Sequence, residues 1–337
     1  MKITDFQYDL SEEAIAQSAV EPRHSSRLLD TRDLSDHRFI DLPDLLEPGD
    51  LLIVNETRVR AARLIGERED TGGRVELLLL EHRPDGAWEA MARPARRLRP
   101  GVRVGFGDFT AEITTKPEAG IVTVVLDAED DEEAVDRVGS LPLPPYFTGT
   151  LTDQSRYQTL FANEPGSAAA PTAGLHFTAE VLDLLTRRGV ALARVDLHVS
   201  IDTFRPMSVE HIEDHEMHSE WCAVPDETAR RIAETKQSGG RVIAVGTTVV
   251  RTLESLADGQ GGVEPGTRRT NLFLKPGVRF QVVDGLITNF HMPSSTLLVL
   301  LAAFMGPGWR EAYETALERG YRFLSFGDSM ICFRDLP

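Results

Sequence analysis

The chain has few cysteines and no long apolar run. Its 337 residues include only Cys222 and Cys332, far apart and outside any CxxC spacing, so we expect neither a disulfide framework nor a cysteine zinc site. The longest apolar run, 296–305, is half of the ~20 residues that a membrane span needs. The N-terminus lacks the apolar core of a signal peptide. We therefore expect a cytoplasmic protein without a membrane span.

Basic residues are scarce, and the net charge of −17 argues against loose, non-specific nucleic-acid binding. Residues 58–103 are the exception, with eleven Arg, no Lys and seven acidic residues, a local charge of +4 against −21 for the rest. Without interleaved aromatic residues this stretch predicts no stacking platform for single strands. It is either a solvated face or a phosphate-binding surface, and the concentration of arginine favours phosphate contacts. The arginines concerned are Arg93, Arg96, Arg97 and Arg99.

Two kinds of secondary-structure pattern occur along the chain. From 74 to 126, short β-rich runs alternate with Gly, Pro and Asp turn signals, which predicts a small antiparallel barrel or sandwich. Elsewhere, strands at 191–199 and 241–245 alternate with helices at 179–188 and 226–236, the pattern of α/β construction. We therefore predict an α/β main domain with an inserted small all-β, barrel-like domain. The expected ranges are 1–57 and 151–337 for the α/β domain and 58–150 for the insert.

Segment 171–178, Pro-Thr-Ala-Gly-Leu-His-Phe-Thr, leads into an amphipathic helix with Thr178 at the N-cap position. Its turn could present backbone N–H groups to a ligand, or it could be a simple loop–helix junction with His176 packed inside. At 241–255 a strand passes through Gly246 into a helix, and such a turn favours anions. Neither GxxxxGK[ST] nor GxGxxG is present, so no motif in the sequence supports a P-loop nucleotide site or a dinucleotide-binding site.

At 286–305 a strand gives way to Asn289 and His291, and then to an apolar helix with Ser294 or Ser295 as N-cap. N-capping of the apolar helix accounts for the two serines without a binding role. Polar groups at the mouth of a buried helix are costly unless they are hydrogen-bonded, so a binding role is favoured for Asn289 and His291.

Segment 196–206, DLHVSIDTFRP, predicts a strand that exposes Asp202, Thr203 and Arg205 at its carboxyl end, where α/β sheets bind ligands. Asp202 could instead cap a turn. Segment 211–221, HIEDHEMHSEW, would align His211, His215 and His218 on one face if it were helical, so a metal site has to be considered. No HExxH pattern is present, and a loop that binds substrate or bonds locally is the alternative.

In order and wording, these segments resemble the S-adenosylmethionine:tRNA ribosyltransferase-isomerase family of queuosine biosynthesis along almost the entire chain. The motifs that carry the resemblance are DFQYDLSEEAIAQ, DLLIVNETRVRAARL (50–64), PLPPYF, RYQTLFA (156–162), PTAGLHFT, DTFRP, HEMHSEW, VGTTVVRTLES, FLKPG (273–277), ITNFHMPSSTLL and YRFLSFGDSMI (321–331).

The resemblance implies an α/β portion interrupted by a β-barrel, and it implies the reaction. The ribosyl unit of S-adenosylmethionine, a co-substrate, is transferred to 7-aminomethyl-7-deazaguanine at the wobble position of tRNA. It is rearranged into an epoxycyclopentanediol, adenine and methionine leave, and epoxyqueuosine remains in the tRNA. No metal is implied. We expect a monomer that acts on S-adenosylmethionine and tRNA.

We assign roles to site residues by hypothesis. Proton transfer belongs to His176, His215, His218 and His291, with Asp202 or Glu220 as carboxylate partner. Arg60 and Arg251 hold the tRNA phosphate or the methionine carboxylate. The other substrate-binding positions are Pro171, Thr172, Ala173, Gly174, Leu175, Thr203, Phe204, Gly246, Thr247, Thr248, Asn289, Phe290 and Pro293.

The chain departs from the family pattern at three places. Ser200-Ile201-Asp202 stands where the family has Gly-Ala-Gly, Ser294 where a Lys is common, and Asn271 where an acid is usual. Two alternatives follow. One is a tRNA-binding relative that has lost catalysis through the changes at 200–202 and 294, and the other is a metal-dependent hydrolase that uses His211, His215 and His218.

Overall fold

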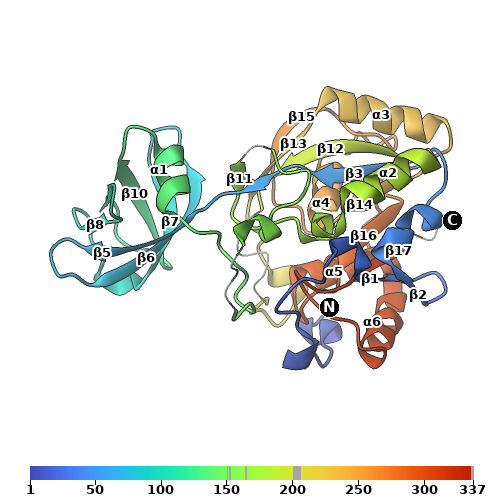
Figure 1. Cartoon of the computed structure of the whole chain (residues 1–337), viewed down its shortest axis with the longest axis horizontal. Helices are drawn as coiled ribbons and strands as arrows, with labels where there is room; N and C mark the ends of the chain where they lie inside the picture. The colour runs from blue at the N-terminus through green and yellow to red at the C-terminus, as the bar shows by residue number, and fades with distance from the viewer. Residues whose placement is uncertain (150, 152, 164, 200–205, 335–337) are drawn as a thin grey trace. The chain divides into compact units, whose positions relative to one another are not determined.

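The computed structural model describes residues 1–149, 151, 153–163, 165–199 and 206–334 (Figure 1). Its contacts divide the chain into two compact units, each built around its own strands. The main unit comprises Met1–Arg58, Pro145–Gly166 and Ala170–Pro337, and the barrel unit comprises Val59–Pro144 and Ser167–Ala169. The chain passes from one unit to the other after Arg58, Pro144, Gly166 and Ala169. The first of these passages lies in β4 (Arg58–Val59) and the third in β11 (Pro165–Ser167).

The barrel unit is a closed barrel of six antiparallel strands in the order β10-β7-β6-β5-β8-β9. The predicted all-β insert is thereby confirmed, and of the two forms considered it is a barrel. A short helix, α1 (Asp131–Val138), follows the last strand, and the carboxylate of Asp130 caps it by accepting from Glu133 N. The strands are β5 (Arg63–Arg68), β6 (Arg74–His82), β7 (Trp88–Arg93), β8 (Arg103–Gly105), β9 (Thr110–Ile113) and β10 (Ile121–Asp127).

The main unit is built on a nine-stranded sheet in the order β15-β13-β12-β3-β14-β16-β17-β1-β2. Its centre, β12-β3-β14-β16, is parallel, while antiparallel pairs flank it. This mixed sheet with its helices confirms the α/β prediction. Strands buried on both faces read as continuous apolar runs, as in β14. The strands are β1 (Arg27–Asp30), β2 (Ser35–Arg38), β3 (Leu51–Asn55), β12 (Ala191–Leu197), β13 (Glu220–Val224), β14 (Val242–Val245), β15 (Gly266–Thr270), β16 (Gly285–Asn289) and β17 (Ser329–Phe333).

Two helices of the main unit begin at cap positions that the sequence predicted, and one of them has a side-chain cap. α2 starts after Thr178, although the Thr178 hydroxyl bonds His24 Nδ1 at 2.7 Å instead of a helix N–H, and it ends at Gly189 in the left-handed conformation. Ser295 caps α5 by accepting from Leu298 N at 3.2 Å. No helix among the described residues is long and apolar enough to cross a membrane. The α-helices are α2 (Ala179–Arg188), α3 (Asp226–Gln237), α4 (Thr247–Ser255), α5 (Thr296–Met305) and α6 (Trp309–Glu318).

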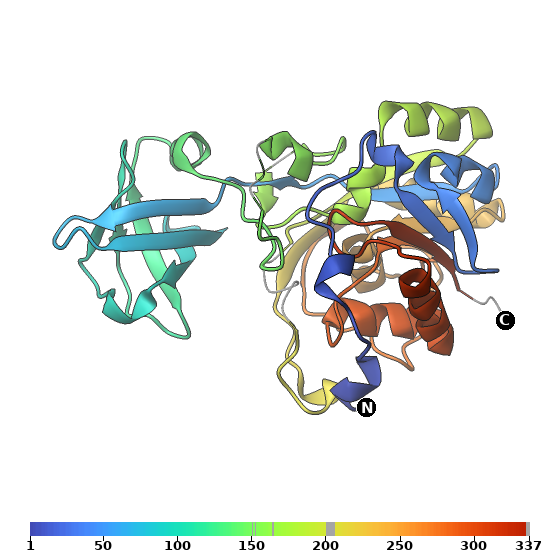
Figure 2. The same cartoon turned by 60° about the horizontal axis from the view of Figure 1, so that its bottom comes forward.

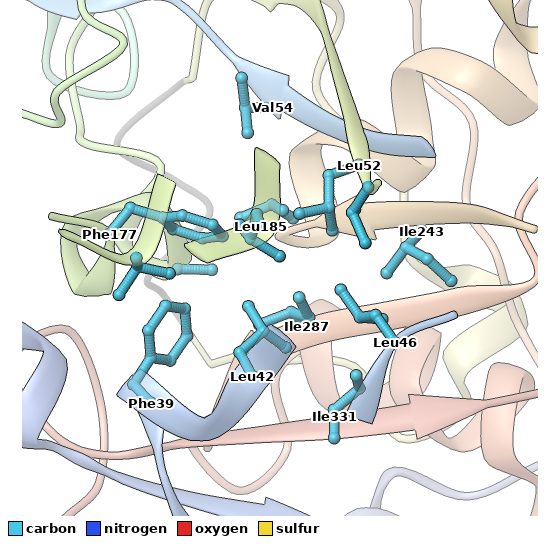
Figure 3. Close-up of a cluster of buried hydrophobic side chains, with 14 of the residues drawn as sticks. Phe39, Leu42, Leu46, Leu52, Val54, Phe177, Leu185, Ile243, Ile287 and Ile331 are labelled. Atoms are coloured by element: carbon cyan, nitrogen blue, oxygen red, sulfur yellow. The ribbon is translucent and has the colours of Figure 1, made fainter. Parts of the chain in front are cut away.

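A buried apolar cluster joins the sheet to the elements that cover it (Figure 3). Phe39 and Leu42 come from η4, Leu185 from α2, and Ile243 and Ile287 from central strands. This core fixes the ends of β14 and β16, from which the site is built. The 3-10 turns are η1 (Ile3–Phe6), η2 (Glu12–Ala14), η3 (Arg23–Ser25), η4 (Phe39–Leu45), η5 (Ala95–Arg97), η6 (Gln154–Tyr157), η7 (Thr172–His176), η9 (Ile212–Asp214) and η10 (Gly306–Gly308).

The segment 211–221 is not a helix, so the helical alignment of its three histidines is wrong. It forms the short turn η9, an irregular stretch and the start of β13. Figure 2 shows the N-terminal turn η1 beside η9, and Ile3 N donates to Glu210 O at 3.0 Å. Local spacing could not reveal this backbone pairing, because the partner lies about 200 residues away in the chain.

Candidate active site

A first cavity opens where β14 and β16 end and where α4 and α5 begin. This is the carboxyl edge of the parallel strands, at which α/β sheets bind ligands. Of the predicted site residues, those that line it are Pro171, Thr172, Ala173, Gly246, Thr247, Thr248, Asn289, Phe290 and His291. Gly174 and Leu175 are buried in the same turn without lining the cavity, and Pro293 lies partly buried in the loop before α5.

Asn289 is the hydrogen-bonding centre of the first cavity. It is 3% exposed, and its Oδ1 accepts from Thr172 Oγ1 at 3.1 Å. Its Nδ2 lies 3.1 Å from His176 Nε2 and 3.2 Å from the carbonyl oxygens of Leu324 and Asp328. The amide thus ties β16 to η7 and to the C-terminal segment, and its orientation is fully determined.

His176 lies behind the cavity wall and is fully buried. Because Asn289 Nδ2 is a donor, His176 Nε2 accepts, and Nδ1–H donates to Ser26 Oγ at 2.7 Å. The ring stacks on Phe39 with centroids 5.0 Å apart. Burial, with the nearby positive charge of Arg23, lowers the pKa of His176 well below its usual value, so the ring is neutral. Both nitrogens are engaged, which suits the ring to orienting Asn289.

His291 lines the first cavity and is 7% exposed. Its Nε2 lies 3.0 Å from Thr288 Oγ1, and Nδ1 has no hydrogen-bond partner among the described residues. Burial lowers the pKa of His291 to about 3, so the ring is neutral near pH 7. Its backbone is clamped from both sides, because His291 N donates to Tyr313 Oη at 2.8 Å and Tyr8 Oη donates to His291 O.

The start of α4 supplies unused donors to the same cavity. Gly246, at φ +92°, turns β14 into the helix, a conformation that favours glycine. The first N–H groups of a helix have no intrahelical partner. The Thr248 hydroxyl is buried as well, with no hydrogen-bond partner among the described residues, and Thr248 is 8% exposed. An unpaired buried hydroxyl in a cavity wall points to a ligand that bonds it.

Replacing Thr248 by Val should raise the KM for the ligand of this cavity ~5- to 100-fold, because the ligand group loses its partner. Thermal stability should stay unchanged, since the hydroxyl has no protein partner to lose among the described residues. Thr252→Val is the matched control on α4. Its hydroxyl donates to Thr248 O at 3.0 Å, so that change should lower stability by about 1 kcal/mol and leave KM alone. A Thr248→Val enzyme with normal KM would contradict the role.

A second cavity adjoins the first, since Leu297 lines both. His215, His218, Glu220 and Arg251 line it, so the structure separates the four predicted histidines into different places. Burial lowers the pKa of His215, and the charge of His218 contributes to the same shift. Glu220 and Arg251 form a buried ion pair, with side chains 3% and 6% exposed.

Arg60, expected to hold a substrate anion, is engaged within the barrel unit. Its guanidinium makes a bidentate contact with Glu132 at 2.7 and 2.8 Å and lies 4.9 Å above the Trp88 ring. Its side chain is only 11% exposed, so the substrate role expected for it lacks an accessible guanidinium. Asp202, Thr203 and Phe204 lie outside the described residues, as does the departure at 200–202.

The four arginines expected to contact tRNA are exposed, unlike Arg60. Arg93, Arg96, Arg97 and Arg99 are exposed on the barrel unit around η5, and none has an acidic partner among the described residues. Their charge is therefore available to an external anion.

Sequence reasoning missed several residues of the first cavity. Tyr146 and Ser325 lie 2.6 Å apart through their hydroxyls and form one wall. Both belong to motifs quoted for the family resemblance, PLPPYF and YRFLSFGDSMI, and this membership was the only signal.

The N-terminal segment was missed too. Ser294, at the position where the resemblance led us to expect Lys, has φ +55°, donates from its N to Phe6 O at 2.9 Å and accepts from Gln7 Nε2 at 2.9 Å.

Within the ranges that the structure describes, no three His, Cys, Asp or Glu side chains are arranged to hold a metal ion. His211 is exposed, 3.9 Å from Glu210, and does not line the cavity that His215 and His218 share. The ligand set of the metal-dependent alternative is therefore not assembled in these residues.

Comparison with known proteins identifies the family. Residues 3–332 match a family model described as "Queuosine biosynthesis protein". Three relatives are named S-adenosylmethionine:tRNA ribosyltransferase-isomerase. They come from Heliobacterium modesticaldum (50% identical), Symbiobacterium thermophilum (49%) and Acetivibrio thermocellus (47%), each covering 98% of this chain and 99% of its own.

A solved structure, S-adenosylmethionine tRNA ribosyltransferase from Thermotoga maritima, is similar at 36% identity with a TM-score of 0.56, covering 97% of this chain and 99% of that one. The similarity thus extends over both units and includes the motifs from which the two cavities are built. This chain belongs to the S-adenosylmethionine:tRNA ribosyltransferase-isomerase family of queuosine biosynthesis.

Proposed function

We propose that this chain transfers the ribosyl unit of S-adenosylmethionine to 7-aminomethyl-7-deazaguanine at the wobble position of tRNA and isomerises it, giving epoxyqueuosine and releasing adenine and methionine. The observation that carries the proposal is the pair of adjoining cavities along α4. The first offers hydroxyl and amide groups and the second a buried ion pair, so together they can hold a ligand with nucleoside and amino-acid parts. We include a monomeric, cytoplasmic enzyme without a metal in the proposal.

The chemistry requires a base, because the sulfonium centre acidifies the C5′ protons of S-adenosylmethionine. We assign this role to His291, which is neutral near pH 7 and lines the first cavity. We assign the tautomer in which Nε2–H donates to Thr288 Oγ1, so that Nδ1 carries the lone pair that accepts the proton. The same ring can return a proton to the departing adenine.

Asn289 and His176 form the support of this base in our proposal. Asn289, whose Nδ2 is held by His176 Nε2 and by two carbonyl oxygens, presents the second lone pair of its Oδ1 to the nucleoside. His176 acts as a positioning residue, because accepting a substrate proton would break one of its two hydrogen bonds. The proton-transfer role expected for His176 is replaced accordingly. Asp202 stays a candidate carboxylate partner outside the described residues.

For tRNA, we assign backbone contacts to Arg93, Arg96, Arg97 and Arg99. Changing all four to Gln should raise the KM for tRNA and make the slope of log K against log salt shallower by up to ~3 to 4, at 0.7 to 0.9 per lost phosphate contact. Binding of S-adenosylmethionine should stay unchanged. Arg187→Gln, an exposed arginine on α2, is the control. An unaltered salt slope in the fourfold variant would remove these contacts from the account.

The proposal is tested by incubating the full-length protein with S-adenosylmethionine and tRNA that carries the aminomethyl base. We expect adenine in the supernatant and epoxyqueuosine among the digested nucleosides. Binding of tRNA without either product would favour the catalytically inactive relative and would overturn the proposal. Light scattering of the same sample checks the monomer.

A further inference from the structure

The second cavity contains a buried ion pair with one donor unused. Glu220 on β13 and Arg251 on α4 contact each other, and as whole residues they are 4% and 5% exposed. Arg251 Nε reaches Leu272 O at 3.4 Å, while Nη2 is buried with no hydrogen-bond partner among the described residues. A buried charged donor without a partner is costly, so the site is built for a ligand that accepts from Nη2.

The charge of the cavity selects the kind of ligand. Glu220 and Arg251 neutralise each other, and burial lowers the pKa of the neighbouring His215, which keeps that ring neutral at pH 7. Binding phosphate here would bury negative charge without compensation. A zwitterion brings one charge of each sign, and its carboxylate and ammonium can each face the opposite member of the pair.

The remaining lining fits an apolar, sulfur-containing chain. The apolar residues that line the same cavity are Met207, Met217, Phe273, Leu297 and Leu300. Methionine side chains adapt to irregular ligands, and sulfur makes favourable contacts with aromatic rings such as that of Phe273.

The position on α4 links this cavity to the first. Thr247 and Thr248 line the first cavity, and Arg251, three to four residues later, lines the second. Residues with this spacing are neighbours on one helix face, with Cβ atoms about 5–6 Å apart. A ligand that bonds Thr248 at its nucleoside end can therefore reach Arg251 at its other end.

We propose that the second cavity is a zwitterion site for the amino-acid end of S-adenosylmethionine, in which Arg251 Nη2 binds the α-carboxylate and Glu220 the α-ammonium. Released L-methionine occupies the same site, and it competes with S-adenosylmethionine. This inference rests on the proposed function, and it chooses the methionine carboxylate over the tRNA phosphate as the partner of Arg251.

The test uses the full-length protein without tRNA and L-methionine as the probe, measured by saturation-transfer NMR and by competition with S-adenosylmethionine. Two analogues each lack one charge: 4-(methylthio)butanoate has no ammonium and 3-(methylthio)propylamine has no carboxylate. We expect saturable binding of L-methionine and at least ~10-fold weaker binding of each analogue, as for loss of a charge-assisted hydrogen bond. Equal binding of either analogue, or no competition by L-methionine, would overturn the site.

A double variant tests the residues themselves. Removing one partner alone would leave a buried charge, so Glu220→Gln with Arg251→Met replaces both and keeps the site neutral. It should bind L-methionine at least ~10-fold more weakly. Asp50→Asn with Arg241→Gln is the matched control, because that pair, 2.6 Å apart with Asp50 buried, does not line either cavity. A double variant at 220 and 251 that folds and binds L-methionine normally would refute the assignment.

The two proposals fail in different ways. Adenine release by an enzyme that does not bind L-methionine would overturn the zwitterion site and leave the proposed function standing. Binding of L-methionine without adenine release would overturn the proposed function and leave the zwitterion site standing.

Discussion

Replacing Asn289 by Ala should reduce adenine release at least ~100-fold, because a displaced cavity wall misaligns the reacting groups. It should also lower the free energy of unfolding by about 2–4 kcal/mol, since several buried partners lose their hydrogen bonds at once. Those partners are His176 Nε2, the Thr172 hydroxyl and the carbonyl oxygens of Leu324 and Asp328.

The two effects are measured separately, by adenine release at saturating substrate and by urea unfolding. Asn271→Ala is the control, because Asn271 is exposed and lies on the segment after β15. Normal activity in a destabilised Asn289→Ala protein would show that the amide is structural only, and the central place of Asn289 in the site would then be wrong.

Replacing His291 by Gln should lower kcat by ~10²- to 10⁴-fold, the usual range for loss of a general base. Binding of S-adenosylmethionine should change much less, because Gln retains a polar group near Thr288. His37→Gln provides the control, since that half-buried histidine bonds Ser35 on the edge strand β2. A His291→Gln enzyme with a normal kcat would require another base.

The His291→Gln variant should also change how the free energy of unfolding depends on pH. Burial lowers the pKa of His291 to about 3, whereas an unfolded histidine titrates near 6.5. The unfolded state therefore binds the proton first. The stability associated with the neutral ring is fully present above about pH 6.5 and is lost as pH falls toward 3, at up to ~1.4 kcal/mol per pH unit.

His291→Gln removes this term. Relative to the parent protein, its free energy of unfolding should improve by about 2 kcal/mol between pH 7 and pH 5. Urea unfolding at the two pH values measures the difference, and carboxylate titrations common to both proteins cancel. His176, whose pKa is also well below its usual value, continues to contribute in both. A difference that does not change between the two pH values would mean that the pKa of His291 in the fold equals its value in the unfolded chain, and the lowered pKa would then be wrong.

Local signals predicted the elements around the site well. α2 spans Ala179–Arg188 as expected, because an amphipathic repeat lies between Thr178 at the N-cap position and the left-handed Gly189. The sequence also placed the turns at Gly246 and Asn289 at the ends of strands, because an apolar, β-rich run leads into each of them. Since neighbouring parallel strands share one carboxyl edge, these turns had to come together in the cavity.

Long-range packing decided what the sequence could not. His176 and His291 lie in similar motifs, yet one is stacked on Phe39 and bonded to Ser26, about 150 residues earlier, while the other lines the cavity. The local patterns offered a packed His176 and favoured a binding role for His291, whereas the shared assignment of proton transfer to both histidines did not separate them. The clamp of Tyr8 on His291 and the pairing of Glu220 with Arg251 depend in the same way on contacts between distant segments.

The most direct test of the account follows the ribose carbons. Full-length protein is given S-adenosylmethionine labelled with ¹³C throughout its ribose, together with tRNA carrying 7-aminomethyl-7-deazaguanine, and the digested nucleosides are weighed by mass spectrometry. The account predicts that all the labelled ribose carbons appear in the modified nucleoside, with adenine and methionine released in equal amounts. Label that stays in a soluble nucleoside, or transfer of only the methyl carbon to tRNA, would contradict it.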